Sequence, residues 1–170
     1  MTSIFFKTYR NKWNPINKVV ELLELKWIDQ VILQNSVDFH IQPIVTKNKE
    51  VFAYEMLARF RDDNGNSVSP MEVFSAAKKQ NRTYALDHVC RMNAVRKAAS
   101  ISHRKVFINF LPTSIYSPEH CLRTTVHLAN QLGIPFSQLV FEVVETESVN
   151  DIEHLKKYYC ITEKKVGNML

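Results

Sequence analysis

The chain has 170 residues, enough for one domain with a buried core, and its 45% hydrophobic and 23% charged residues are typical of a folded globular protein rather than a disordered or fibrous one. It contains three glycines, no two of them close together. The sequence therefore contains neither a P-loop nor a G-x-G-x-x-G dinucleotide-binding motif, which excludes the usual modes of ATP, GTP and NAD binding. The net charge of +5 comes from 22 Lys and Arg interspersed with 17 Asp and Glu, which indicates a mildly basic surface rather than a nucleic-acid groove.

The sequence predicts a cytoplasmic protein with neither a nucleic-acid nor a membrane partner. The first residues lack an extended apolar segment of the kind found in signal peptides, and no run approaches the roughly 20 apolar residues that a membrane span needs. The three cysteines, Cys90, Cys121 and Cys160, are odd in number and far apart. This usage fits a reducing compartment better than a disulfide scaffold.

The hydrophobic pattern predicts an alternation of helices and strands. A helix capped by Asn14 opens at Pro15 and reaches Leu33, a polar link then joins two strands as a hairpin, and Ser69 with Pro70 marks the start of the next helix. The hairpin strands are expected at 38–45 and 51–60, and two further strands at 105–111 and 138–144. The helix that starts at Pro70 is expected to reach residue 77, and further helices are expected at 82–100, 117–132 and 150–159. Gly133 is expected to close the 117–132 helix in a left-handed conformation. Helices that alternate with strands in this way predict βα units on a largely parallel sheet.

Three of the predicted strands each carry one polar side chain among apolar ones: Glu55, Asn109 and Glu142. One interpretation is that each of them faces solvent. The other is that they share a partner, because an uncompensated buried carboxylate is very costly. Carboxylate and amide oxygens are the ligands that Mg²⁺, Mn²⁺ or Ca²⁺ takes, and the carboxyl ends of barrel strands are where such sites lie. Taken jointly, the three residues favour a shared cation.

Arg59 is predicted to lie on the same strand face as Glu55, nearer the strand end, because successive side chains alternate between faces. Its guanidinium could bind a phosphate through two hydrogen bonds or pair with a neighbouring carboxylate. The spacing of Arg59 from Glu55 along the strand is compatible with both interpretations. The six histidines form no closely spaced pair, so a zinc site is not expected.

The segment Tyr54-Glu55-Met56-Leu57-Ala58-Arg59-Phe60 resembles the signature strand of the EAL family of cyclic di-GMP phosphodiesterases. Four further motifs agree with the family pattern in order and spacing. These are Gln42-Pro43-Ile44, Leu86-Asp87, Asn109-Phe110-Leu111-Pro112 and Phe141-Glu142-Val143-Val144-Glu145. The resemblance covers roughly residues 27–158. It implies an α/β fold, an incomplete TIM-like barrel that contains about the first half of the strands and whose first strand is antiparallel.

The resemblance also implies a division of the chain and a set of site residues. The expected parts are an N-terminal segment and helix (1–26), a partial EAL domain (27–159) and a C-terminal tail outside the family pattern (160–170). Glu55, Asn109 and Glu142 would bind the catalytic Mg²⁺ or Mn²⁺, and Glu55 and Glu145 would serve catalysis. Gln42, Arg59 and Asp87 would contact cyclic di-GMP, which would be hydrolysed to linear pGpG by a metal-activated water.

Two departures from the family pattern bear on activity. Val144 stands where the family usually has Thr, and the printed sequence ends before the D-D-F-G strand that supplies further metal carboxylates. From this pattern we expect a truncated signalling hydrolase of bacterial type, with weak or absent metal binding and little activity in this form. A second copy or a partner chain could complete the barrel. The alternative is a non-catalytic module that binds cyclic di-GMP or another protein.

Overall fold

The computed structural model describes residues 27–101, 103–111 and 118–143. Residues 27–33 are helical, and the first strand follows them after a short turn. The elements after that are β1 (Asp38–Val45), β2 (Val51–Arg61), β3 (Ser67–Val68), α2 (Pro70–Lys79), α3 (Thr83–Ala98), β4 (Lys105–Phe110), α4 (Pro118–Gln131) and β5 (Leu139–Val143). At 16 residues α3 is longer than α2 and α4, and no helix in the described ranges is long and apolar enough to cross a membrane.

The predicted elements are present within the described ranges, with small shifts at their ends. Ser69 is the N-cap of α2 and Pro70 its first residue, although the Ser69 hydroxyl makes no capping hydrogen bond. The two-residue strand β3, which pairs with the end of β2, and a 3-10 turn before β5 were not predicted. Most of the helix expected from Pro15, and all of the one expected at 150–159, lie outside the described residues.

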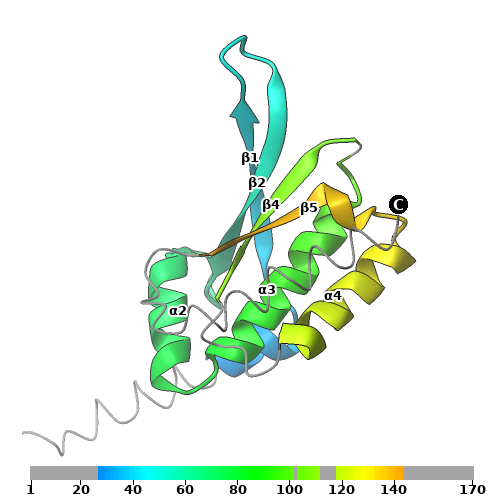
Figure 1. Cartoon of the computed structure of the whole chain (residues 1–170). Coiled ribbons are helices and arrows are strands. Elements are labelled where there is room, and N and C mark those ends of the chain that lie inside the picture. Colours follow the sequence, from blue (N-terminus) through cyan, green and yellow to red (C-terminus); the bar gives the residue numbers. More distant parts are fainter. Residues whose placement is uncertain (1–26, 102, 112–117, 144–170) are drawn as a thin grey trace, which may run out of the picture.

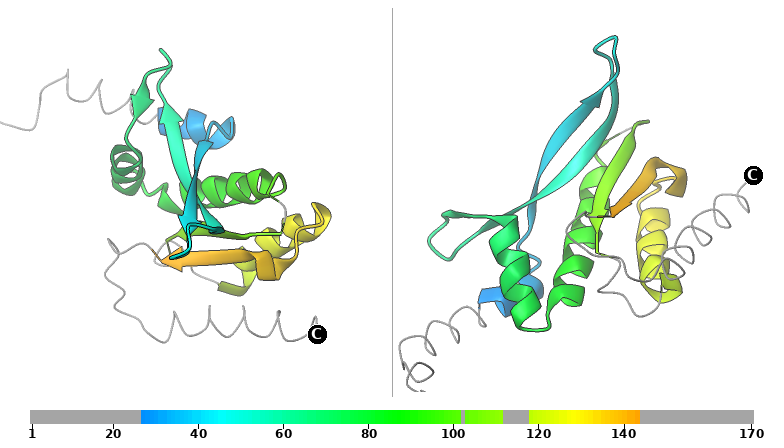
Figure 2. Two further views of the ribbon diagram at one scale, coloured as in Figure 1. Left: turned by 90° about the horizontal axis from the view of Figure 1, so that it is seen from above. Right: turned by 60° about the vertical axis from the view of Figure 1, so that its left-hand side comes forward.

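The sheet has the strand order β1-β2-β4-β5, with β3 paired to the carboxyl end of β2. β1 pairs with β2 antiparallel, whereas β2, β4 and β5 run parallel to one another. The β1–β2 hairpin projects beyond the rest of the sheet, and α3 and α4 lie side by side (Figures 1 and 2). The structure therefore confirms the predicted fold class, an incomplete TIM-like barrel with an antiparallel first strand.

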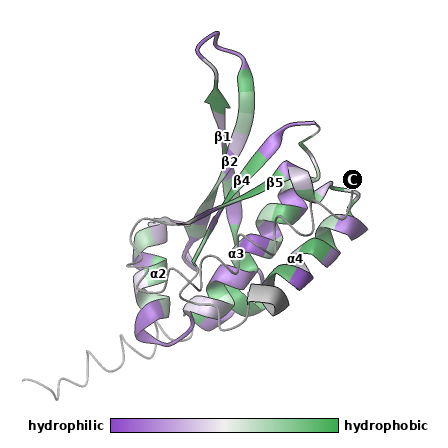
Figure 3. Ribbon diagram, in the orientation of Figure 1, coloured by the Kyte–Doolittle hydropathy of each residue, from purple (hydrophilic) through white to green (hydrophobic). Residues whose placement is uncertain are grey.

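Strand alternation divides the sheet into a helix-covered face and an inner face. Met56 of β2 and Val106 and Ile108 of β4 are nearly fully buried and pack with residues of α3 and α4, among them Val95 and Ala129. The strands are largely hydrophobic, while the tip of the β1–β2 hairpin is hydrophilic (Figure 3). Because neighbouring positions on a strand point to opposite faces, the residues between these core positions face away from the helices.

A second core cluster fixes the carboxyl end of β2. Phe60 is 1% exposed and packs among apolar side chains of the helical residues 27–33, α2 and α3. Its ring meets Phe74 of α2 edge to face, with the ring centroids 6.3 Å apart. The free thiol of Cys90 belongs to the same cluster, where burial raises its pKa. The end of β2 is thus held from three helices.

Gly133 ends α4 as the sequence predicts, with a φ of +67°. No atom lies within 4 Å of the position that a Cβ would occupy, so replacement is limited by backbone strain and not by space. We expect Gly133→Ala to lower the free energy of unfolding by about 1 kcal/mol and Gly133→Asn to cost less, because Asn tolerates the left-handed region. Urea denaturation of the three proteins measures this, and equal losses in both variants would contradict it.

Candidate functional site

A row of polar side chains crosses the inner face of the sheet. The strand register places Gln42 of β1 opposite Glu55 of β2, and Asn109 of β4 opposite Glu142 of β5. Glu55 itself lies opposite Phe107, two residues before Asn109 on the same strand. Four strands therefore bring four predicted site residues to one band of the sheet.

Glu55 and Asn109 are in direct contact, although they are 54 residues apart in the sequence. The Asn109 side-chain amide donates from Nδ2 to Oε1 of Glu55 over 3.0 Å. Both side chains are half-buried, whereas Glu142 is exposed. Asn109 and Glu142 each lie next to the last residue of their strand, but Glu55 is in the middle of the longer strand β2. The three polar residues that interrupt apolar strands thus lie on one face of adjacent strands.

The chemistry of these three side chains fits a hard divalent cation. Two carboxylates and one amide oxygen are the ligand types that Mg²⁺ and Mn²⁺ take, and Mg²⁺ commonly keeps several waters beside one or two carboxylates. Within the described ranges, no group of three or more His, Cys, Asp or Glu side chains is close enough to hold a metal ion. These residues would therefore form one side of a coordination shell, with further oxygens coming from water or substrate.

Arg59 lies near the end of β2, four residues beyond Glu55 and on the same face of the strand, as the sequence predicts. Its Nε donates to Nδ1 of His40 over 3.0 Å, and its Nη1 donates to the carbonyl oxygens of Leu57 and Ala58. Among the described residues, Nη2 of Arg59 has no hydrogen-bond partner. The sequence interpretation gave His40 no role, yet its position two residues before Gln42 on the same strand would have placed it on this face.

A cavity of about 690 Å³ opens beside the Arg59 side chain. Its lining includes His40 from β1, Arg59 and Arg61 from β2, and Trp27 and Gln30 from the preceding helix. This volume lies within the range of small-molecule binding sites. The guanidinium of Arg59 is thus placed at the wall of a space large enough for a ligand.

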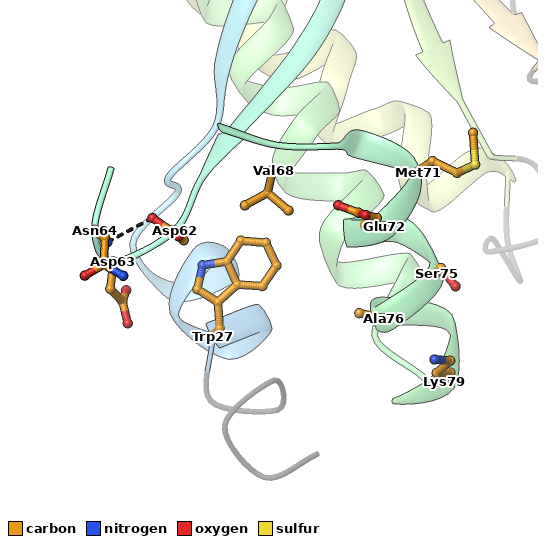
Figure 4. Close-up of a pocket in the computed structure, with 10 residues that line it drawn as sticks. All are labelled: Trp27, Asp62, Asp63, Asn64, Val68, Met71, Glu72, Ser75, Ala76 and Lys79. Carbon is orange, nitrogen blue, oxygen red and sulfur yellow. Dashed lines mark hydrogen bonds between the residues drawn. The ribbon is translucent and has the colours of Figure 1, made fainter. Parts of the chain in front are cut away.

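A different cavity, of about 710 Å³, lies between Trp27, the β2–β3 turn and α2 (Figure 4). The turn is closed by Asp62, whose carboxylate accepts hydrogen bonds from the side chain and backbone of Asn66 and from the backbone of Asn64, and these bonds hold its pKa below the ordinary value. None of the predicted site residues lines this cavity.

The remaining predicted site residues, Asp87 and Glu145, are placed differently. Asp87 lies in α3 and is 3% exposed; its Oδ1 accepts the backbone N–H of Leu111, and its Oδ2 pairs with Arg91. Direct contact between Asp87 and a ligand stays a prediction. Glu145 lies outside the described residues. The sequence interpretation singled out neither Arg91 nor Thr125, whose Oγ1 accepts a hydrogen bond from Nη1 of Arg91.

The family model of the EAL domain matches residues 25–166, which is most of the chain. The chain belongs to the EAL domain family. The match spans every strand of the sheet and all of the predicted site residues. No match is found among the curated proteins.

Solved structures of EAL domains share the fold. The Xanthomonas citri FimX EAL domain in complex with c-diGMP has a TM-score of 0.76 at 14% identity and covers 89% of this chain and 60% of that one. A standalone EAL protein from Vibrio cholerae in its c-di-GMP bound form has a TM-score of 0.57 at 35% identity, covering 75% and 53%. Klebsiella pneumoniae BlrP1 in a manganese and cy-diGMP complex has a TM-score of 0.62 at 24% identity, covering 75% and 32%. The chain thus spans less than two thirds of each of these proteins.

Proposed function

We propose that the inner face of this sheet binds cyclic di-GMP together with Mg²⁺ or Mn²⁺, as part of an EAL-type phosphodiesterase site. The observation that carries the proposal is the Asn109–Glu55 hydrogen bond with Glu142 directly opposite Asn109. Three strands far apart in sequence direct oxygen-bearing side chains to one place on a face that the described helices leave uncovered. Oxygen-bearing side chains grouped in this way are the hard ligands that Mg²⁺ and Mn²⁺ take.

In this proposal each residue has a distinct role. Glu55, Asn109 and Glu142 hold the cation, which when bound polarises a phosphodiester oxygen and lowers the pKa of a bound water. Gln42 and Arg59 orient the dinucleotide, and Nη2 of Arg59, whose Nε and Nη1 are engaged within the chain, donates to a phosphate oxygen. Of the two other predicted site residues, Asp87 supports the site from α3, and Glu145 supports the metal site.

The solved relatives support the choice of ligand. The Vibrio cholerae protein, at 35% identity, is described in its c-di-GMP bound form, and the FimX domain and BlrP1 are described in complexes with the same dinucleotide. BlrP1 is described with manganese and also with calcium. This chain spans only part of those proteins. The proposal therefore has two further parts: hydrolysis of the dinucleotide, and completion of the barrel by further chain, a second copy or a partner.

The test is titration of the 170-residue chain with cyclic di-GMP by calorimetry, with and without Mn²⁺. We expect binding that tightens when Mn²⁺ is present and no binding of linear GpG of equal concentration. A chain that is folded by circular dichroism and binds neither cyclic di-GMP nor Mn²⁺ contradicts the proposal. Hydrolysis to pGpG is the second readout: binding without turnover assigns the chain to the non-catalytic alternative.

Arg59→Ala is expected to weaken cyclic di-GMP binding by about 10- to 100-fold, because it removes charge-assisted hydrogen bonds to a phosphate. Arg96→Ala is the matched control: Arg96 lies on α3, does not line the cavity beside Arg59, is exposed and donates to Oδ1 of Asn93. Calorimetric titration of both variants makes the comparison. An equal loss in the two variants would show that the effect is general charge and not the placement of Arg59.

A further inference from the structure

A buried ion pair lies inside α3, behind the strand that carries Asn109. Arg91 is 0% exposed and Asp87 is 3% exposed, and Nη2 of Arg91 lies 3.2 Å from Oδ2 of Asp87, one helical turn away. Burying two charges carries a large desolvation cost, and apolar side chains of similar volume often give an equally stable protein. Stability alone is therefore a poor reason for this pair, and its further contacts indicate what it does.

The pair is the centre of a hydrogen-bonded chain that joins three elements. On one side, Oδ1 of Asp87 accepts the backbone N–H of Leu111 over 3.1 Å, at the end of β4. On the other side, Nη1 of Arg91 donates to Oγ1 of Thr125 on α4 over 2.7 Å, and Thr125 is 0% exposed. A single carboxylate thus connects the backbone that leaves β4 to two helices behind the sheet.

Leu111 is two residues beyond Asn109, with the buried Phe110 between them. Phe110 faces the helices, so Asn109 faces the inner side of the sheet, where it donates to Glu55. The hydrogen bond to the amide of Leu111 fixes the direction in which the chain leaves β4. It thereby fixes the position and orientation of the Asn109 side chain. The hydrogen-bonded chain is therefore connected to the candidate metal site through two backbone steps.

We propose that Asp87, Arg91 and Thr125 form a positioning network that holds Asn109 in its orientation toward Glu55. The Asp87 carboxylate is the member that acts on β4, Arg91 orients that carboxylate, and Thr125 fixes Arg91 from α4. None of the three needs to touch the ligand for this role. The inference rests on the proposed function only for what Asn109 and Glu55 then bind.

Two double variants of the full chain separate positioning from stability. Asp87→Leu with Arg91→Met replaces the pair by apolar side chains and removes the acceptor for Leu111. Asp87→Asn with Arg91→Met also removes both charges but keeps an oxygen where Oδ1 accepts. We expect both proteins to fold, because neither leaves a buried charge unpaired.

Nuclear magnetic resonance of ¹⁵N-labelled protein gives a readout that needs no ligand. In the Leu and Met double variant we expect the Asn109 side-chain amide resonances, assigned from their loss in Asn109→Leu, to shift toward free-amide positions. We also expect the Leu111 amide to exchange about 10-fold faster with solvent. In the Asn and Met double variant both signals should stay close to those of the unsubstituted chain. Mn²⁺ affinity should fall about 10-fold in the first variant only.

Unchanged Asn109 resonances and Leu111 exchange in a folded Leu and Met double variant would overturn the proposal. If that variant does not fold, Thr125→Val is the deciding variant and Thr125→Ser is its matched control. A shift of the Asn109 resonances in Thr125→Val but not in Thr125→Ser supports the network. The absence of a shift in Thr125→Val overturns it. If the unsubstituted chain binds neither Mn²⁺ nor cyclic di-GMP, the proposed function fails, while the resonance comparison still decides this inference.

Discussion

Replacing Arg91 alone, as Arg91→Met, is expected to lower the free energy of unfolding by about 3–5 kcal/mol. The substitution removes a guanidinium that is 0% exposed and leaves the Asp87 carboxylate buried without its cation. A carboxylate in this position must either remain charged at a high desolvation cost or take up a proton. Since a domain of this size is stable by only about 5–15 kcal/mol, the variant should lose a large fraction of its stability. Urea denaturation followed by circular dichroism measures the change.

The double variant Asp87→Asn with Arg91→Met serves as the control for this prediction, because it also removes the carboxylate that Arg91→Met leaves unpaired. We expect it to recover most of the loss, so that the two substitutions are strongly non-additive. A single Arg91→Met protein that loses less than about 1 kcal/mol would mean that the pair is not the buried, mutually dependent unit that the structure indicates.

Glu55→Gln is expected to weaken Mn²⁺ binding by roughly 10- to 100-fold, because it removes one of two negative ligands while keeping the size of the side chain. The substituted side chain keeps an oxygen that can accept from Asn109 Nδ2, so the hydrogen bond across β2 and β4 is preserved. The loss should therefore appear in the metal affinity and not in the thermal midpoint. Electron paramagnetic resonance of free Mn²⁺ during titration measures the affinity.

Glu50→Gln is the matched control for the metal prediction. Glu50 lies in the exposed turn of the β1–β2 hairpin, away from the polar row of the inner face, and carries the same charge as Glu55. Its substitution should leave Mn²⁺ affinity unchanged. A similar loss in both variants would indicate diffuse attraction of the cation by the surface rather than coordination by Glu55.

The elements that the sequence predicted well are those whose signals are local. Alternating apolar residues predicted β1 and the start of β2, proline after Ser69 marked the start of α2, and Gly133 closed α4 with the expected positive φ. Polar residues inside apolar strands predicted that Glu55, Asn109 and Glu142 would face the same side. Both kinds of signal need only neighbouring residues and the period of the strand.

What the sequence did not predict depends on contacts between distant segments. Arg91 is one of several cations on α3, and nothing next to it indicates that it is fully buried against Thr125 of α4, 34 residues away. The predicted contact of Asp87 with the dinucleotide stays a prediction, but nothing in the sequence indicated that its two oxygens are engaged by Leu111 and Arg91. Burial of a charge pair is decided by tertiary packing, which periodicity along one helix does not report.

The antiparallel first strand also affects the order in which the site assembles. β1 and β2 are joined by a tight turn, so closing this loop costs little chain entropy, and isolated hairpins of this kind form within microseconds. Pairing of β4 with β2 must instead wait until the chain has doubled back through α2 and α3. We therefore expect Gln42 and Glu55 to come into register early in folding, and the slower parallel pairing that delivers Asn109 to limit the rate at which the site is completed.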